Sequence, residues 1–264
     1  MKESDFQAFQ IHRKGRVLTL AMNNGQRLNA IEDTLHHELS QIFRFAARDQ
    51  ESDVVILTGI DDWFCAGGDF DWFQAMIDDP VRFERIAIDG KEIVFSLLDL
   101  EKPLIAKVNG PAAGLGATIA LFSDVIFMSE KAVLLDPHVK AGLVAGDGGA
   151  VIWPQLIGYA RAKHYLMTGE AVKADEAISM GLVNYIFPRE ELDEAVDKYA
   201  SALAAGATRA IRWTKVSVNI ALKQLAHSIM DASIAYEIST NTAQDHQEAV
   251  TAFKDNRPPN FSDV

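Results

Sequence analysis

The chain contains two glycine-rich segments, and each stands between a strand-like run and a helix-like run. The first reads FCAGGD at residues 64–69, and the second reads NGPAAGLG at residues 109–116. Each can leave backbone N–H groups pointing into a cleft where a helix begins. Two such loops are able to hold one oxyanion between them. They restrict the chain to folds in which strand, loop and helix follow one another.

Strand and helix signals alternate over the first two thirds of the chain. Helical spacing is clearest over residues 31–45, where apolar side chains recur every three or four positions on one face. Short β-branched runs predict strands at residues 17–20, 54–58, 104–108, 125–127 and 183–187. This alternation predicts the α/β class, without distinguishing a doubly wound sheet from other layered arrangements.

The last part of the chain is predicted to be entirely helical. The expected helices cover residues 190–205, 208–225, 228–242 and 245–254. No linker rich in Pro, Gly or Ser precedes them. We therefore divide the chain into an α/β core, residues 1–189, and a C-terminal helical region, residues 190–264, that is not an independent domain.

Composition excludes several classes of function. The chain has 264 residues, 48% of them hydrophobic and 23% charged, which is ordinary for a soluble globular protein. Its net charge of −12 argues against a nucleic-acid surface and gives no reason to expect membrane binding. Cys65 is the single cysteine, which fits a reducing compartment. With no signal-peptide pattern and no spanning apolar stretch, we expect a cytoplasmic protein.

An ordered series of motifs resembles the crotonase superfamily, also called the enoyl-CoA hydratase/isomerase family. The resemblance runs from about Val17 to Phe261. Besides the two glycine loops it includes LNA at 28–30, DVI at 124–126, LMTG at 166–169, ADEA at 174–177, AFK at 252–254 and RPP at 257–259. It implies a crotonase-like spiral of ββα units. It also implies that the C-terminal helical region builds a homotrimer or a dimer of trimers.

The resemblance also implies a substrate and a way to bind it. Members of this family hold an acyl-CoA thioester and stabilise its enolate with two backbone amides, which here match Gly68 and Leu115. Coenzyme A would enter as part of the substrate, so no separate cofactor is expected. The matching positions at the binding site are Leu28, Ala30, Ala66 and Thr118.

The catalytic pair of the family is altered in this chain. A hydratase of the family uses two glutamates, and the matching positions here are Thr118 and His138. The two-glutamate mechanism therefore does not transfer. The imidazole of His138, with an ordinary pKa near 6.5, suits proton transfer at neutral pH. Asp147, further along the glycine-rich loop, is able to accept from one ring nitrogen and orient it.

The His138 and Asp147 spacing, followed by Trp153 and Pro154, also resembles the oxocamphor-type β-diketone hydrolases. That branch of the superfamily cleaves a carbon–carbon bond with water, and His36 and Glu237 match its pocket positions. The branch lacks the ordinary CoA-type glycine loops, which this chain keeps. An enoyl-CoA hydratase/isomerase-like enzyme is thus the first hypothesis. A β-diketone hydrolase and a non-catalytic CoA-binding homologue are the alternatives.

No metal site is expected from the sequence. His36 and His37 are adjacent, so their side chains point in different directions on a helix. No later pair of histidines has convincing ligand spacing. Cys65 has no basic neighbour in the sequence and is predicted to be a small packed residue.

Overall fold

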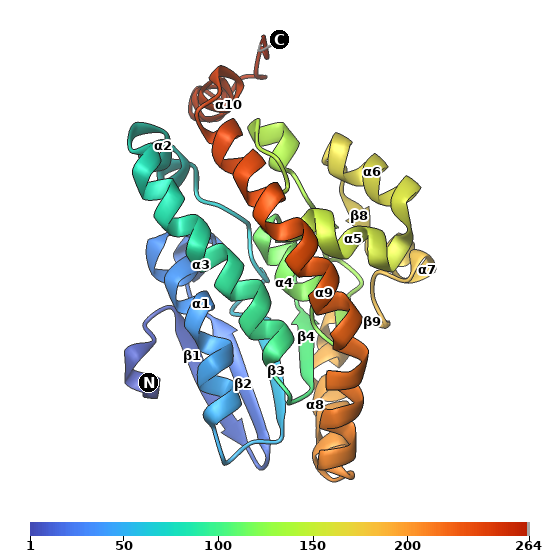
Figure 1. Cartoon of the computed structure of the whole chain (residues 1–264). Helices are drawn as coiled ribbons and strands as arrows, with labels where there is room; N and C mark the ends of the chain where they lie inside the picture. Colours follow the sequence, from blue (N-terminus) through green and yellow to red (C-terminus); the bar gives the residue numbers. More distant parts are fainter. Residues whose placement is uncertain (263–264) are drawn as a thin grey trace.

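The computed structural model describes residues 1–262, in which strands and helices alternate (Figure 1). The strands are β1 (Phe9–Lys14), β2 (Val17–Met22), β3 (Val54–Gly59), β4 (Leu104–Val108), β5 (Ala112–Ala113), β6 (Val125–Ser129), β7 (Val133–Leu135), β8 (Val172–Lys173) and β9 (Tyr185–Phe187). The helices are α1 (Asp33–Arg48), α2 (Phe70–Asp78), α3 (Pro80–Asp99), α4 (Leu115–Leu121), α5 (Gly149–Ile157), α6 (Tyr159–Thr168), α7 (Ala174–Met180), α8 (Arg189–Ala204), α9 (Thr208–Asn241) and α10 (Gln244–Lys254). Short 3₁₀ turns are η1 (Glu3–Asp5), η2 (Gly25–Arg27) and η3 (His138–Ala141).

The main sheet has six strands in the order β1-β2-β3-β4-β6-β9. β1 pairs with β2 in an antiparallel hairpin, and all the other pairs in this sheet are parallel. A second sheet has the order β5-β7-β8. The five predicted strands are confirmed as β2, β3, β4, β6 and β9. β1 was not predicted because only Phe9 and Ile11 of its six residues are apolar, and β5, β7 and β8 were missed because they are too short to form a pattern.

The main sheet is covered on both faces, and the strand periodicity shows how. β3 is buried along its whole length. Val55 and Leu57 belong to the large core that includes residues of α1 and α3, whereas Ile56 packs in a second cluster with Leu192 and Val196 of α8. Successive side chains of a strand point to opposite faces. The start of the C-terminal helical region is therefore part of the sheet packing.

The helix predictions are largely confirmed, with one correction. The predicted helices at 31–45, 190–205 and 245–254 correspond to α1, α8 and α10. The segments 208–225 and 228–242, expected as two helices, form the single helix α9 of 34 residues. No Gly or Pro interrupts residues 225–228, and within the helix the Ser228 hydroxyl donates to the Leu225 carbonyl (2.7 Å) instead of capping a new start. None of the helices within residues 1–262 is long and apolar enough to cross a membrane.

The pairing of β3 with β4 places the two glycine loops. These strands are adjacent and parallel, with Ile56 beside Ile105 and Thr58 beside Lys107. Their carboxyl ends therefore meet at one edge of the sheet, where ligand sites of such sheets usually form. The segment after β3 leads to α2, and the segment after β4 leads through β5 to α4. The fold thus brings residues 64–69 and 109–116 to the same edge.

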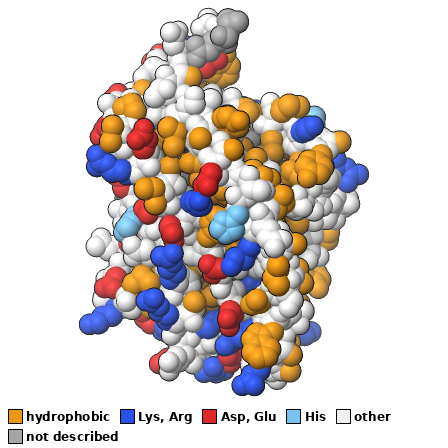
Figure 2. Space-filling model, viewed as in Figure 1, with side chains coloured by type: hydrophobic (Ala, Val, Ile, Leu, Met, Phe, Trp, Pro, Cys, Tyr) orange, Lys and Arg blue, Asp and Glu red, His pale blue; other side chains and the backbone are white. Residues whose placement is uncertain are grey.

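A buried ion pair anchors α9 against the sheet. The Lys215 ammonium lies 2.7 Å from Asp124 Oδ2 and donates to the Lys102 carbonyl at 2.9 Å. Asp124 Oδ2 also accepts the N–H of Leu104 at the start of β4. Burial raises the pKa of Asp124 and lowers that of Lys215, because both charges are largely removed from water. On the outer face of α3 and α9, by contrast, basic and acidic side chains are interspersed at the surface (Figure 2).

We expect Lys215→Ala to lower the free energy of unfolding by about 1–3 kcal/mol, because it leaves the largely buried Asp124 carboxylate without its counter-charge. Urea denaturation measures this loss. Lys223→Ala is the matched control, since Lys223 lies on the exposed side of the same helix and pairs with Asp99 at the end of α3. This variant should lose less than about 1 kcal/mol of unfolding free energy. Equal losses in both variants would contradict an anchoring role for Lys215.

Candidate active site

The two glycine loops are joined directly to one another. Cys65 pairs with Ala112 in an isolated parallel bridge. The Cys65 N–H donates to the Pro111 carbonyl at 3.2 Å, and the Ala113 N–H donates back to the Cys65 carbonyl at 2.9 Å. Gly67 (φ +83°) and Gly114 (φ +53°) adopt positive φ angles that other residues rarely tolerate. The loops therefore lie side by side with their glycines turned toward each other.

Two backbone amides in these loops are free to bind a ligand. In the described part of the chain, the N–H groups of Gly68 and Leu115 donate to no other group. Both residues line one pocket. Next to Gly68, the Asp69 carboxylate caps α2 by accepting from the N–H groups of Asp71 (2.9 Å) and Trp72 (3.2 Å). The capping side chain satisfies the first turn of α2 and leaves the preceding amide available.

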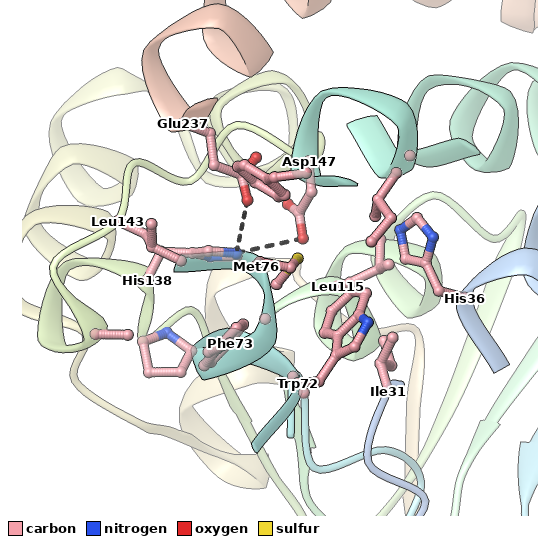
Figure 3. Close-up of a pocket in the computed structure, with 18 of the residues that line it drawn as sticks. Ile31, His36, Trp72, Phe73, Met76, Leu115, His138, Leu143, Asp147 and Glu237 are labelled. Carbon is pink, nitrogen blue, oxygen red and sulfur yellow. Dashed lines mark ion pairs between the residues drawn. The ribbon is translucent and has the colours of Figure 1, made fainter. Parts of the chain in front are cut away.

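His138 lies in the same pocket and faces three carboxylates. It is the first residue of η3, and its side chain is only 11% exposed. Its Nδ1 lies 2.5 Å from Asp136 Oδ1. Its Nε2 lies 3.5 Å from Asp147 Oδ2 and 4.0 Å from Glu237 Oε1. Figure 3 shows Asp147 and Glu237 on the same side of the imidazole, with Glu237 coming from α9.

The His138 ring is oriented by the hydrogen bond that its Nδ1 donates to Asp136, a residue that was not predicted from the sequence. Asp136 is completely buried and also accepts weakly from the His138 backbone N–H (3.4 Å). Asp147, expected as the orienting partner, lies on the Nε2 side instead. It is held there by the Thr118 hydroxyl at 3.2 Å and the Gly149 N–H at 3.4 Å. A sequence signal was present, since an aspartate can accept locally from the backbone N–H two residues later and so stay beside that residue.

The carboxylates shift the proton affinity of the site. Burial by itself lowers the pKa of His138, but the charges of Asp136 and Asp147 outweigh it and raise the pKa well above 6.5. Burial raises the pKa of Asp147 and of Glu237, and the positive charge of His138 opposes both shifts. At neutral pH the imidazole therefore holds a proton on Nε2 that faces two carboxyl groups. Such a cluster is able to give and receive protons near neutrality.

The rest of the pocket is mainly apolar. It encloses about 190 Å³. Its walls come largely from α2 and α3, with Phe70, Trp72, Phe73, Met76, Phe83 and Ile86 among the lining residues. Such a cavity suits an apolar group that carries its reacting atoms at the polar end.

The structure separates the selected binding residues into two groups. Ala66, Gly68, Leu115, His36, His138, Asp147 and Glu237 line the pocket, whereas Leu28, Ala30 and Thr118 are not among its lining residues. The Leu28 side chain is 44% exposed, and its carbonyl accepts from the Ala66 N–H at 3.2 Å. Ala30 and Thr118 are buried. Leu28 and Thr118 are linked to the site through their neighbours, Thr118 by holding Asp147.

Two other groups near the site have limited chemistry. Asp136, His138 and Asp147 offer ligand atoms within 4.8 Å of one another. The 2.5 Å contact between Asp136 and Nδ1 leaves no space for a metal ion between those two groups.

Burial raises the pKa of the Cys65 thiol to about 12, so the thiol stays protonated. Cys65 packs between the loops, where a Cβ on Gly116 would lie 2.6 Å from its own Cβ.

We expect Asp136→Asn to lower the pKa of His138 by more than about one unit, because the amide removes a negative charge while the burial that disfavours imidazolium remains. Titration of the ring protons by NMR measures this change. Asp197→Asn is the control, because that carboxylate pairs with Lys14 on the outer surface and should leave the His138 titration unchanged. An unaltered His138 pKa in Asp136→Asn would contradict the electrostatic coupling.

Comparison with known proteins places the chain in a family. The enoyl-CoA hydratase/isomerase family profile matches residues 12–264. A 1,2-epoxyphenylacetyl-CoA isomerase from Escherichia coli is 29% identical, with 95% of this chain and 97% of that protein covered. A short-chain-enoyl-CoA hydratase from Clostridium acetobutylicum is 30% identical, with 94% of each covered.

Solved structures share the fold. An enoyl-CoA hydratase/isomerase from Mycobacterium paratuberculosis has a TM-score of 0.89 at 30% identity, covering 92% of this chain and 97% of that one. A β-diketone hydrolase from the cyanobacterium Anabaena, bound to (S)-3-oxocyclohexyl acetic acid, has a TM-score of 0.84 at 31% identity, covering 92% of this chain and 98% of that one. The expected crotonase-like α/β fold is thus confirmed. The chain belongs to the enoyl-CoA hydratase/isomerase family of the crotonase superfamily and is an enzyme of that type.

Proposed function

We propose that the enzyme binds an acyl-CoA thioester, stabilises its enolate between the Gly68 and Leu115 amides, and transfers a proton with His138. The observation that carries this proposal is the position of the two unbonded N–H groups beside the imidazole. A Cβ placed on Gly114 would lie 3.5 Å from His138 Cε1 and 4.0 Å from Gly67 Cα. Both loops and the ring therefore border one small volume.

The two amides suit the oxygen of a thioester. Loss of an α proton leaves its electron pair delocalised onto the thioester oxygen, where negative charge develops. Donors fixed in advance at that point stabilise the charge without reorganising, and each is worth roughly 3–4 kcal/mol in comparable sites. The glycines on either side keep side chains away from the oxygen. This arrangement lowers the barrier to enolate formation whichever reaction follows.

His138 and its carboxylates would replace the missing glutamate pair. Asp136 fixes the ring through Nδ1, so Nε2 points toward Asp147 and Glu237. The imidazolium gives its Nε2 proton to the substrate, and a neighbouring carboxyl group accepts the proton that the substrate loses. Thr118, at a former glutamate position, holds Asp147 by its hydroxyl. A carboxylate is thereby supplied from the loop before α5 instead of from α4.

We expect the enzyme to exchange α protons of phenylacetyl-CoA or hexanoyl-CoA for deuterium in D₂O, as measured by mass spectrometry. His138→Ala should slow the exchange by about 100-fold or more, the usual loss for a positioned acid or base. The dissociation constant from calorimetry should change less than about threefold, because the amides that bind the ester remain.

His37→Ala is the matched control, because His37 is the exposed neighbour of His36 on α1. This variant should catalyse the exchange at the wild-type rate. Absence of exchange with every ester that binds would contradict the enolate mechanism. Full exchange by His138→Ala would move the proton transfer to another group.

A second function, hydrolysis of a β-diketone, is favoured by one specific observation. His36, His138, Asp147 and Glu237 come from separate parts of the chain and all line the same pocket. The relative from Anabaena is named as a β-diketone hydrolase. In this reaction the water oxygen bonds to one carbonyl carbon, the adjacent carbon–carbon bond breaks, and the released carbon takes a proton. The two amides would then stabilise the enolate leaving group.

Cyclohexane-1,3-dione in H₂¹⁸O tests this second function. A hydrolase releases 5-oxohexanoic acid with one ¹⁸O in its carboxyl group, and His138→Ala should slow the release by about 100-fold or more. If the wild-type enzyme leaves the dione intact while it exchanges α protons of the CoA esters, hydrolysis is excluded for this simple ring. Ring opening without any binding of CoA esters would instead replace the first function.

A further inference from the structure

His36 is a buried polar side chain without a partner. It lies on the inner face of α1 and is 6% exposed. Its backbone N–H is used in the helix, donating to the Glu32 carbonyl. Among the described residues, no hydrogen bond reaches its ring, whose one close aromatic neighbour is Trp72 at 5.4 Å between centroids. Buried polar groups in native proteins are nearly always hydrogen-bonded, so this exception calls for an explanation.

The imidazole of His36 borders the pocket at a distance from His138. Figure 3 shows Leu115 and Trp72 between the two histidines in that view. Opposite the ring lies α3, where Gly90 leaves space: a Cβ at that position would lie 3.9 Å from His36 Nε2. Both residues line the cavity. A bound molecule is therefore able to reach the ring nitrogen.

No other lining side chain from α2 or α3 offers a free hydrogen-bonding atom at this end. Phe83, Ile86 and Ala87 are apolar. The indole N–H of Trp72 is already used, because it donates to Asp33 at 2.7 Å. Within residues 1–262, the imidazole of His36 on α1 is therefore the polar group available to a ligand at this end of the pocket.

The protonation state of His36 limits what it can bind. Burial lowers its pKa to about 4, against the weaker opposing effects of Asp89 and Asp33. A neutral imidazole offers one donor and one acceptor and no charge. That combination matches a carbonyl or hydroxyl oxygen, whereas a carboxylate would be left without a counter-charge.

We propose that His36 hydrogen-bonds an uncharged oxygen on the acyl group, so that the substrates are acyl-CoA esters carrying an oxo or hydroxyl group away from the thioester. This inference rests on the proposed function and narrows its substrate class. The thioester oxygen occupies the Gly68 and Leu115 amides, the apolar walls hold the intervening carbons, and the second oxygen satisfies His36. An unsubstituted acyl chain would leave the ring unpaired.

Calorimetry with a matched series of esters tests the inference. Hexanoyl-CoA is compared with 4-oxohexanoyl-CoA and 5-oxohexanoyl-CoA, which differ from it by one oxygen at successive carbons. For the wild-type protein, at least one oxo ester should bind about tenfold or more tightly than hexanoyl-CoA, since a site built for a hydrogen bond discriminates against the analogue lacking it. His36→Leu should abolish this preference, and His36→Gln, which keeps a donor and an acceptor, should retain part of it.

Two further measurements separate this role from a structural one. Without ligand, His36→Leu should raise the Tm by about 2 °C, because an unpaired polar group is replaced by an apolar one of similar size. Gly90→Ala adds a methyl group at ordinary contact distance and favours the helix, so it should fold while partly covering the nitrogen. It should reduce the preference for the oxo ester severalfold.

The binding results distinguish the role of His36 from the proposed acyl-CoA function. If hexanoyl-CoA and the oxo esters bind with equal affinity, the role of His36 is refuted and the proposed function stands. A preference that survives in His36→Leu also overturns it. If no ester of either kind binds, the acyl-CoA function fails and the inference fails with it.

Discussion

The parallel pairing of β3 with β4 is the constraint on which the site depends. Because the two strands run in the same direction, the chain must leave both at the same edge of the sheet. The loops that follow can then bond to each other through Cys65 and Ala112. Each loop alone offers one amide at an arbitrary position. Only the shared edge brings these two free amides, from distant parts of the sequence, into one pocket.

The charges around His138 set the protonation of the proposed catalytic cluster. Three carboxyl groups share a nearly water-free volume with one imidazole, and they cannot all be ionised at low cost. The shifts found for His138, Asp147 and Glu237 are the result of that competition. The pKa values thus belong to the coupled cluster as a whole. Removing one carboxyl group changes how the proton is distributed among the remaining groups.

Local patterns in the sequence predicted the strands β2, β3, β4, β6 and β9, the helical periodicity and both loops, because these depend on neighbouring residues. The orientation of the His138 ring could not be obtained in this way. Asp136 and Asp147 are both within reach along the chain, and only the path of η3 and the rotamer of the ring decide which nitrogen each one meets. The continuity of α9 escaped prediction for a related reason, since Ser228 can cap the start of a new helix or bond within a continuous one.

The length of α9 connects the surface of the protein to its chemistry. Lys215 fixes one end of this helix to the sheet, and Glu237 reaches the imidazole about six turns later, roughly 33 Å away at 1.5 Å per residue. Over that length, a tilt of about 1° at the anchored end displaces the carboxyl group by roughly 0.6 Å. A change in the tilt of α9 would therefore change the distance between Glu237 and the imidazole. Amino-acid changes far from the pocket can therefore alter the acidity of the site while every residue that touches the substrate stays the same.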